Sequence, residues 1–413
     1  MILYISSKII KKGGGNVNGK EYFIYLLSCH LNNEKPEGQS GIDWKEIYEL
    51  SKKNSVTGII MTEIRQLDKQ YQPEKEIFSA FNQNLGFTLQ VYESKISAIS
   101  KLLSVLTKAE IPHLLVKGAV LRNMYPEPAL RTSGDTDVVV KESDFQKTVD
   151  VLSENGFETE SVEGYVATTL FEDHRFEIHT ELESINVQSK IYFSTPFDDI
   201  SECSGFTYKL MPIYHLIYVI THIAHHMKIG GAGIRMLMDI DVLVRNYPEL
   251  DYKLFRNICR NIRIEKTADT LFALCIKWFS TPVQCDFSFD SEDNQDFYND
   301  LCSMILDGGT FGFGNGGVGK DNLERSIGKN GKATFFTSLK ALFHWIFPSF
   351  EYMKGCFLYA RKHPVLIPFA WFHRLFKALF VYNKKSTGNL KEIFTGKEMS
   401  EKQHQLLTEL ELK

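Results

Sequence analysis

A change of hydrophobic period near Ile111 constrains the fold of this chain more than any other feature. Before it, apolar residues recur at helical spacing, and after it short apolar runs alternate with glycine bends. The runs at 113–116 and 137–140 predict strands, with one or two helical turns at 119–125 between them. The pattern therefore predicts an α/β unit inside a largely helical chain.

The segments that follow complete this small unit. A helix is predicted at 143–155, and extended segments are predicted at 157–162 and 165–182, the second with a turn at 172–174. The helical period returns from Pro212. The expected fold class is α+β, a small mixed β-sheet flanked by N-terminal and C-terminal helical regions.

The length of the chain, 413 residues, exceeds one typical core, so several structural units are expected. We divide it into an N-terminal helical region (1–108), an α/β core (109–205), a helical domain (206–300) and a C-terminal region (301–413). The last region combines a Gly-rich loop with basic, aromatic helices.

Composition and charge indicate a soluble protein. Hydrophobic residues make up 43% of the chain and charged residues 24%, and the net charge is only −4. This small charge gives no general attraction to nucleic acid, so a duplex is not an expected partner. The seven cysteines are widely spaced without a Cys-x-x-Cys pair, which predicts free thiols in a reducing cytoplasm and argues against zinc. The apolar stretch near the C-terminus is too short to span a bilayer.

The segment from Lys332 to Lys385 has a charge balance of its own. It holds nine basic residues, one acidic residue (Glu351) and many Phe and Trp side chains. Amphipathic helices that pack against the core would explain this composition. Two alternatives stay open, namely binding of an acidic partner and peripheral contact with a membrane surface.

Asp135-Thr-Asp137 opens the second predicted strand and carries the strongest chemical signal. Residues two apart on a strand point to the same face, so the two carboxylates can act together. Such oxygen ligands hold Mg²⁺ or Mn²⁺, and nucleotide phosphates can complete the coordination. The alternative is a strand-entry turn with two solvated acids, because Asp-x-Asp also occurs by chance.

A third acid is available in the extended segment that follows. Glu177, His179 and Glu181 share one face by the period of two. We expect Glu177 to be a third metal ligand, or a general base that accepts a proton from an attacking hydroxyl. The alternative is a polar strand face without a chemical role.

The glycine bend after the first predicted strand suits a phosphate. At Gly118 backbone N–H groups can approach phosphate oxygens, helped by the helical turn that follows. Lys117 can add a positive charge near the phosphates. Arg131 and Ser133, just before the two acids, can face the same ligand.

The run VKGAVLRNMYPEPALRTSGDTDVVV, followed downstream by FEIHTEL, resembles the DNA polymerase β-like nucleotidyltransferase superfamily. It looks most like a branch of uncharacterised bacterial nucleotidyltransferases. The likeness covers residues 109–182 at the level of motifs and extends more loosely into the helical flanks. The resemblance implies that the small sheet is a polymerase β-like nucleotidyltransferase core.

The same resemblance implies roles for individual residues. Asp135, Asp137 and Glu177 would be metal ligands, and Gly118 and Ala119 would lie at the phosphates of a nucleoside triphosphate. This chain departs from the family pattern at two points. Ala119 stands where a second Gly or a Ser is usual, and the gap from Ala119 to Asp135 is slightly long. These departures keep a protein that binds nucleotide without turnover as an alternative.

Residues farther along the chain are candidates for the acceptor side of the cleft. His222 and His226 are four apart on a predicted helix and share a face. Together with His179, Arg235 and Asp239 they form the candidate acceptor pocket. The alternative is that the two helical histidines only pack against their neighbours.

Two further motifs are rejected on their context. Asp239-Ile-Asp241 repeats the Asp-x-Asp pattern, but its surroundings are helical, so its carboxylates would diverge by about 200° around the axis. Gly314–Lys320 nearly matches a P-loop, but Asp321 stands where Ser or Thr would meet Mg²⁺. We predict a flexible loop for this second segment.

These features together predict a metal-dependent nucleotidyltransferase. It would move a nucleoside monophosphate from a nucleoside triphosphate to a small molecule, sugar or protein, and release pyrophosphate. A non-catalytic nucleotide-binding or sensor module is one alternative. A glycosyltransferase that holds a nucleotide-sugar through Asp-x-Asp is another, although the helical N-terminal region leaves no room for the sheet that it needs.

Overall fold

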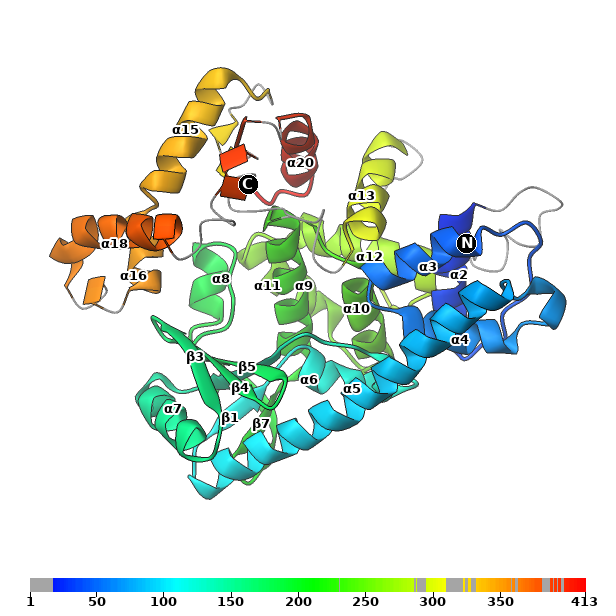
Figure 1. Ribbon diagram of the computed structural model, residues 1–413, viewed down its shortest axis with the longest axis horizontal. Coiled ribbons are helices and arrows are strands. Elements are labelled where there is room, and N and C mark those ends of the chain that lie inside the picture. Colours follow the sequence, from blue (N-terminus) through cyan, green and yellow to red (C-terminus); the bar gives the residue numbers. More distant parts are fainter. Residues whose placement is uncertain are drawn as a thin grey trace.

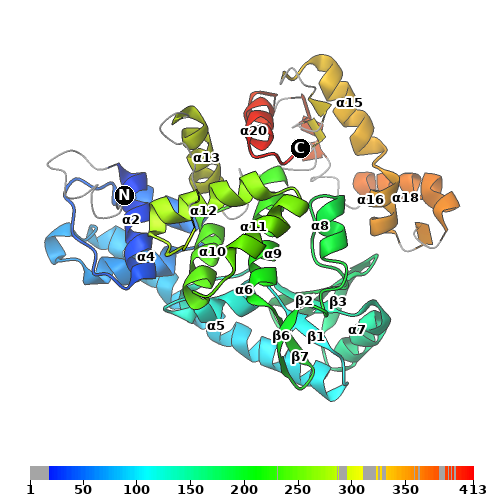
Figure 2. The ribbon, with the colours of Figure 1, turned by 180° about the vertical axis from the view of Figure 1, so that it is seen from behind.

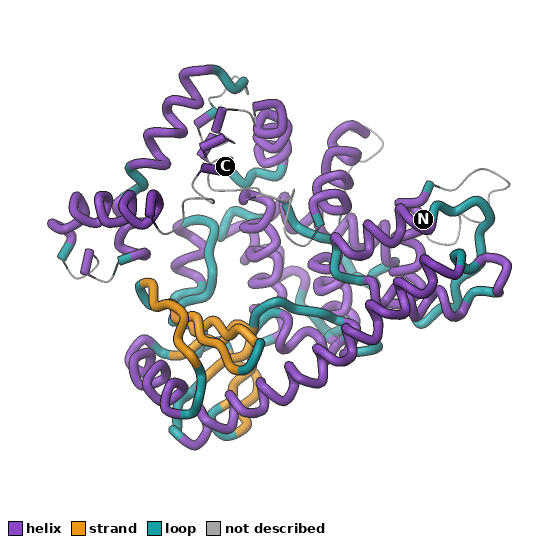
Figure 3. Tube along the Cα trace, in the orientation of Figure 1, coloured by secondary structure: helices purple, strands orange, loops and turns teal. Residues whose placement is uncertain are grey.

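The computed structural model describes most of the chain from residue 18 onward. The described residues are 18–229, 231–285, 287, 295–309, 322–323, 326–327, 332–357, 359–360, 363–380, 387–388, 390–391, 393–394 and 397–413. The P-loop-like segment Gly314–Lys320 lies outside them. Figures 1 and 3 show one group of strands set against a mainly helical body, which confirms the α+β class.

The sheet holds seven strands in the order β3-β4-β5-β2-β1-β7-β6. Their bounds are β1 (His113–Leu115), β2 (Thr136–Val140), β3 (Glu158–Glu163), β4 (Val166–Phe171), β5 (His174–His179), β6 (Ile200–Ser204) and β7 (Thr207–Leu210). Strand β2 runs parallel to β5 and antiparallel to β1, so the predicted acidic strand lies at the centre of the sheet. The predicted turn between β4 and β5 is confirmed, with Glu172 at a positive φ of 52°.

Two strands at one edge of the sheet were not predicted. β6 and β7 form a hairpin around Gly205, which has a φ of 61°, and β7 pairs in parallel with β1. In their sequence, ISECSGFTYKL, β6 lacks the apolar alternation of a half-buried strand, whereas Tyr208 and Leu210 of β7 alternate with Thr207 and Lys209. This alternation is too short to predict a strand by itself, and pairing with β1 completes it.

Helices cover both faces of the sheet. Before and within the sheet region they are α2 (Gly19–Asn32), α3 (Trp44–Lys53), α4 (Thr57–Gln66), α5 (Lys75–Lys108), α6 (Gly118–Leu121), α7 (Phe145–Glu154) and α8 (Val187–Tyr192). After it they are α9 (Pro212–Ile229), α10 (Ile234–Asn246), α11 (Tyr252–Asn261), α12 (Glu265–Phe279), α13 (Gln295–Gly308), α15 (Phe335–Ile346), α16 (Phe350–Cys356), α18 (Ile367–Phe380) and α20 (Lys397–Glu409). One face packs against α5 and α7, and the other packs against α9 and α10.

The period of two on β2 and β5 decides which face each side chain takes. Val138 and Ile178 belong to the core under α5 and α7, whereas Val139 belongs to the core built by α9 and α10. Asp137 is two residues from Val139, and Glu177 is adjacent to Ile178. Both acids therefore point toward the side of the sheet that α9 and α10 cover.

The C-terminal region divides between the body and a projecting arm. The last helix, α20, returns to the main core through Leu406, Leu407 and Leu410. Helices α15, α16 and α18 lie to one side, beyond α8, in both Figure 1 and Figure 2. We call the described residues from Phe335 to Phe380 the C-terminal arm.

Two general expectations can be checked against the described residues. None of the helices within them is long and apolar enough to cross a membrane. The cysteines whose side chains are described are free thiols, as predicted.

Candidate active site

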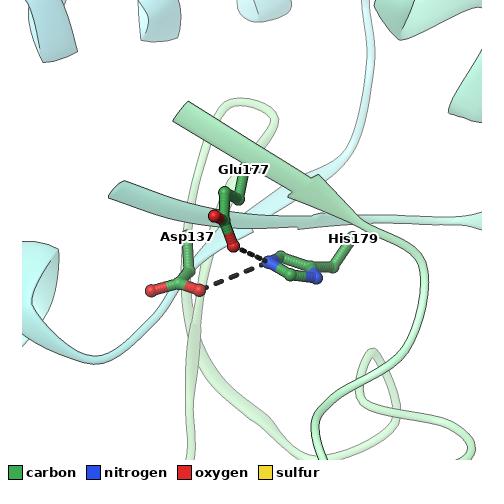
Figure 4. Close-up of side chains that lie close together, drawn as sticks. All are labelled: Asp137, Glu177 and His179. Atoms are coloured by element: carbon green, nitrogen blue, oxygen red, sulfur yellow. Dashed lines mark ion pairs between the residues drawn. The ribbon is translucent and has the colours of Figure 1, made fainter. Parts of the chain in front are cut away.

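Asp137 and Glu177 are paired neighbours on the parallel strands β2 and β5. His179 lies between them, with Nε2 3.2 Å from Asp137 Oδ1 and 3.5 Å from Glu177 Oε2. Figure 4 shows both carboxylates converging on that nitrogen. One oxygen or nitrogen atom from each of the three side chains could bind a metal ion, and these atoms all lie within 4.8 Å of one another. Among the described residues, no second group of His, Cys, Asp or Glu side chains meets this condition. We call these three residues the acid–histidine cluster.

Lys117 approaches the cluster from the end of β1. Its Nζ lies 3.0 Å from Asp137 Oδ1 and 5.9 Å from the centre of the Tyr218 ring on α9. Its backbone has a φ of 51° and a ψ of −131°, a conformation that residues with a side chain rarely adopt. This strained bend carries the chain from β1 directly into α6 and sets the ammonium group beside the carboxylate.

The charges of the cluster reinforce one another. Burial alone would raise the pKa of Asp137, but Lys117 and His179 outweigh it and hold that pKa well below its usual range. Burial also opposes a charged His179, but the carboxylates of Asp137 and Glu177 raise its pKa to about 9. At neutral pH Asp137 is therefore ionised and His179 is protonated.

The donor set fits a divalent cation. Carboxylate oxygens are the hard ligands that Mg²⁺ and Mn²⁺ prefer, and a neutral imidazole nitrogen is a common metal ligand. His179 Nε2 is buried, yet its contacts with the two carboxylates do not have hydrogen-bond geometry. A buried polar atom needs a partner. Once His179 loses its proton, a shared cation would provide that partner for the neutral ring.

Asp135 lies just before β2, with an exposed side chain outside the acid–histidine cluster. By the period of two it shares a face with Asp137. The structure thus brings Asp137 and Glu177 together and leaves Asp135 at the entrance to the same face.

Lys95, a buried residue of α5, holds the backbone around this entrance. Its Nζ donates to the carbonyl oxygens of Ser133, Gly134 and Asp135 at 3.1, 2.9 and 3.1 Å. Burial, aided by the charge of Arg122, lowers the pKa of Lys95 to about 8. No local pattern indicates this contact, because Lys95 lies on a helix far from the strand in the chain.

Gly118 opens α6 in close contact with the residues that precede β2. A Cβ at this position would lie 2.6 Å from Arg131 Nη1 and 3.3 Å from Ser133 Cβ, so a side chain there would need its neighbours to move. The Ser133 hydroxyl accepts a 2.8 Å hydrogen bond from Arg122, whose Nε also donates to the Gly118 carbonyl oxygen. Ala119 follows on α6 and is half-buried.

Arg131, Arg235 and Asp239 join the loop before β2 to helix α10. Arg131 Nη2 lies 2.5 Å from Asp239 Oδ2, and the Tyr125 hydroxyl donates to Asp239 Oδ1 at 2.7 Å. Arg235 donates to the carbonyl oxygen of Thr132 at 2.7 Å. The three candidate residues are all buried and have partners within the protein.

Asp241, the second acid of the helical motif, points elsewhere. Its carboxylate accepts from Arg245 Nε at 2.7 Å and from the Thr281 hydroxyl at 2.6 Å. Asp239 and Asp241 thus have different partners, which confirms that the two carboxylates of the helical Asp-x-Asp diverge.

Helix α9 brings its histidines to a carboxylate that the sequence analysis missed, Glu183. His222 Nδ1 lies 2.5 Å from Glu183 Oε2, and His225 Nε2 lies 3.2 Å from Glu183 Oε1. The His226 ring meets the His222 ring edge-on at 4.4 Å. Extending the alternating face of β5 beyond Glu177 would have reached Glu183, although the strand itself ends earlier.

Electrostatics connect these histidines to the acid–histidine cluster. Despite burial, His222 and Lys117 hold the pKa of Glu183 well below its usual range. Burial and the nearby His222 lower the pKa of His226 to about 3, so His226 stays neutral. Burial opposes a charge on Lys117, but Tyr218, Asp137 and Glu183 together raise its pKa above the usual range. The positive charge of Lys117 therefore interacts with both Asp137 of the acid–histidine cluster and Glu183 beside the α9 histidines.

Comparison with known proteins gives one match. A family model described as "Uncharacterised nucleotidyltransferase" matches residues 40–280, more than half of the chain. The matched region contains the acid–histidine cluster, the glycine bend and the α9 histidines. No curated protein and no solved structure matches the chain.

Proposed function

Because the chain belongs to this family of uncharacterised nucleotidyltransferases, we propose that it transfers a nucleoside monophosphate from a nucleoside triphosphate to an acceptor. Pyrophosphate is the second product. The observation that carries the proposal is the convergence of Asp137, Glu177 and His179 on one point of the sheet, which suits a divalent cation. The family match supports nucleotidyl transfer in general, and the cluster supports its dependence on metal.

Asp137 and Glu177 would hold Mg²⁺ or Mn²⁺, with His179 as a nitrogen ligand. Asp135, at the entrance to the same face, would add a further carboxylate ligand. A bound cation neutralises charge on the transferred phosphoryl group. Since Asp137 is already ionised in the free protein, it needs no loss of a proton before it binds metal.

The nucleotide phosphates would lie at the glycine bend. Lys117 offers its ammonium group to them, and Gly118 and Ala119 let the backbone approach closely. Arg131 and Ser133 belong to the same binding region in this proposal. Arg131 and Ser133 pack closely around Gly118 and keep the glycine bend narrow. Their first contribution is therefore to the shape of this bend.

Glu177 is the carboxylate best placed to receive a proton. Its side chain is 29% exposed, against 8% for Asp137, so an acceptor can reach it more easily. The acceptor oxygen forms a bond to the α-phosphorus while the bond from that phosphorus to the bridging oxygen breaks. Pyrophosphate leaves, and Glu177 takes the hydroxyl proton.

The acceptor side would be formed by α9 and α10. His222 and His226 lie there with Glu183, and Arg235 and Asp239 support the neighbouring loop. A neutral His226 next to the Glu183–His222 pair suits hydrogen bonds to hydroxyl groups. This favours a polar acceptor such as a small molecule, a sugar or a protein side chain.

The proposal is tested with α-labelled nucleoside triphosphates, Mg²⁺ or Mn²⁺, and a panel of hydroxyl-bearing acceptors. Transfer of label by the wild type should be lost in Asp137→Asn. Asp173→Asn is the matched control, because Asp173 is an exposed acid at the opposite end of β5. It removes the same charge outside the cluster and should keep full transfer.

Three outcomes decide between the alternatives. Label transfer that survives in Asp137→Asn would show that the site is misassigned. Nucleotide and metal binding without transfer to any acceptor would favour the sensor module. Transfer of a sugar from a nucleotide-sugar would favour the glycosyltransferase class.

A further inference from the structure

Arg122 is a buried arginine that joins the two segments at which the proposed function places the nucleotide phosphates. It follows α6 directly, and only 2% of the residue is exposed. Its Nε donates to the Gly118 carbonyl oxygen at 3.0 Å, and its Nη2 donates to the Ser133 hydroxyl oxygen at 2.8 Å. One side chain thus links the glycine bend after β1 to the loop before β2.

The charge of Arg122 has no counter-charge beside it. Both of its hydrogen-bond partners are uncharged oxygens, and within the part of the chain that the structure describes it forms no ion pair with a carboxylate. The neighbouring Arg131, in contrast, is paired with Asp239. Burial and the charge of Arg131 lower the pKa of Arg122 to about 10, so its guanidinium group is charged at neutral pH. A buried charge of this kind is unfavourable, and a bound anion would balance it.

The loop that Arg122 contacts presents hydrogen-bond donors on its outer side. The carbonyl oxygens of Ser133 and Gly134 are turned inward to Lys95 Nζ. In a trans peptide the N–H group points opposite to the carbonyl oxygen, so the N–H groups of Gly134 and Asp135 point away from Lys95. No described residue accepts a hydrogen bond from these two groups. The space beside Gly134 is open, since an added Cβ would meet no described atom within 4 Å. Such N–H groups beside open space suit an anion.

The Ser133 hydroxyl provides a further donor, and Arg122 sets its direction. Because the hydroxyl oxygen accepts from Arg122, its hydrogen points elsewhere, and no described residue accepts it. Ser133 also lies against the glycine bend, with its Cβ 3.3 Å from the position of a Cβ on Gly118. Arg122 therefore both holds a donor at the bend and places a positive charge on its inner side.

We propose that Arg122 is a positioning residue for the triphosphate group of the nucleotide. Its charge attracts the phosphates from the inner side of the bend, and its hydrogen bonds hold Gly118 and Ser133 in place for them. This inference rests on the proposed function, which places the phosphates at this bend. A residue that only linked the two segments could do so with uncharged donors. The charge of Arg122 therefore separates a role in phosphate binding from a purely structural one.

Two variants separate the charge of Arg122 from its hydrogen bonds. Arg122→Gln keeps an amide donor and removes the charge, whereas Arg122→Lys keeps the charge. Isothermal titration calorimetry measures the binding of inorganic triphosphate to the full chain, in a buffer with EDTA and without an acceptor. Arg122→Gln should bind triphosphate roughly tenfold more weakly than the wild type, and Arg122→Lys less than about threefold more weakly.

Arg245→Gln is the matched control. Arg245 also donates to an uncharged backbone oxygen, that of Phe279, but its other partner is Asp241, away from the bend. This variant should bind triphosphate like the wild type. Circular dichroism gives the folded fraction of each variant, and affinities are compared per folded molecule.

Ser133→Ala gives a second test that leaves Arg122 itself unchanged. It removes the hydroxyl that Arg122 holds and should weaken triphosphate binding by roughly fivefold. This variant decides the matter if Arg122→Gln does not fold, because unchanged affinity in Ser133→Ala would overturn the proposal.

The remaining outcomes separate this proposal from the proposed function. Triphosphate affinity at the wild-type level in folded Arg122→Gln, or an equal loss in Arg122→Gln and Arg122→Lys, would overturn the role of Arg122. Label transfer that is lost in Asp137→Asn would still support nucleotidyl transfer in that case. Conversely, weaker triphosphate binding in Arg122→Gln would support the role of Arg122 even if no acceptor received label.

Discussion

Two Asp-x-Asp motifs in this chain have the same spacing and different structures. Asp135 and Asp137 enter the central strand β2, whereas Asp239 and Asp241 lie on helix α10. On the strand, Asp137 meets a second carboxylate and a histidine. On the helix, Asp239 forms an ion pair with Arg131, and Asp241 forms a separate one with Arg245.

The secondary structure around each motif therefore determines whether its two carboxylates can act together. The period of two on a strand keeps both acids on one face, and a parallel neighbour can add a third ligand at the same level. The helical period separates the acids by more than half a turn, so each binds a different part of the protein. We therefore expect the strand motif to govern activity and the helical motif to govern stability.

The largest expected effect is loss of transfer when the strand acids are neutralised. Asp137→Asn should lower kcat/KM for label transfer by roughly a thousandfold, because it removes a ligand that stabilises charge on the phosphates. Asp135→Asn should lower it by roughly a hundredfold. The free energy of unfolding in urea should change by less than about 1 kcal/mol in Asp135→Asn, whose side chain is exposed. In Asp137→Asn it should fall by about 1–3 kcal/mol, because Lys117 and His179 lose their counter-charge, so transfer is compared per folded molecule. Transfer at the wild-type rate in Asp137→Asn would show that the strand motif does not govern activity.

The second-largest expected effect is on stability and concerns Asp239, the first acid of the helical motif. Asp239→Asn should lower the free energy of unfolding by about 3–5 kcal/mol, because it leaves the buried Arg131 guanidinium without its counter-charge. Urea unfolding followed by circular dichroism measures this change. A loss below about 1 kcal/mol would show that the ion pair is not needed for stability.

The second helical acid should matter less. Asp241→Asn should lower the free energy of unfolding by about 1–3 kcal/mol, because Arg245 is partly exposed and can turn to water. The same urea experiment applies, and transfer per folded molecule should stay at the wild-type level. If Asp241→Asn instead abolished transfer in a folded protein, the helical motif would have a chemical role after all.

The smallest effect concerns Lys95, which acts on the strand motif through the backbone. Lys95→Met removes the donor to three carbonyl groups before β2 and should lower transfer by about tenfold through poorer placement of Asp135. The loss should fall on kcat, while KM for the nucleotide stays near the wild-type value. Lys95→Arg, which keeps a donor, should recover part of the rate. A change in KM alone would point to a different role.

The sequence predicted the parts of the site that follow from local periodicity. The strand with Asp137, the face of Glu177 and the divergence of the helical acids all come from the spacing of residues along one element. It could not predict Lys95 or Glu183. Those contacts arise when α5 and α9 pack against the sheet, and a tertiary contact leaves no trace in the local pattern.

The edge of the sheet was missed for a related reason. The hairpin of β6 and β7 has only a short apolar alternation, at Tyr208 and Leu210, and pairing with β1 completes its structure. The C-terminal arm shows the opposite case. There the composition was evident from the sequence, but only the structure separates the buried side chains of α18 from the exposed ones.

Whether Asp137 holds the metal ion can be measured by titrating Mn²⁺ into the nucleotide-bound protein and following electron paramagnetic resonance. We expect the wild type to bind Mn²⁺ and Asp137→Asn to bind it at least about a hundredfold more weakly, since the variant loses an ionised ligand. Asp241→Asn, whose partners Arg245 and Thr281 lie outside the cluster, should bind Mn²⁺ like the wild type. Equal Mn²⁺ affinity in the wild type and in Asp137→Asn would show that Asp137 does not hold the metal ion.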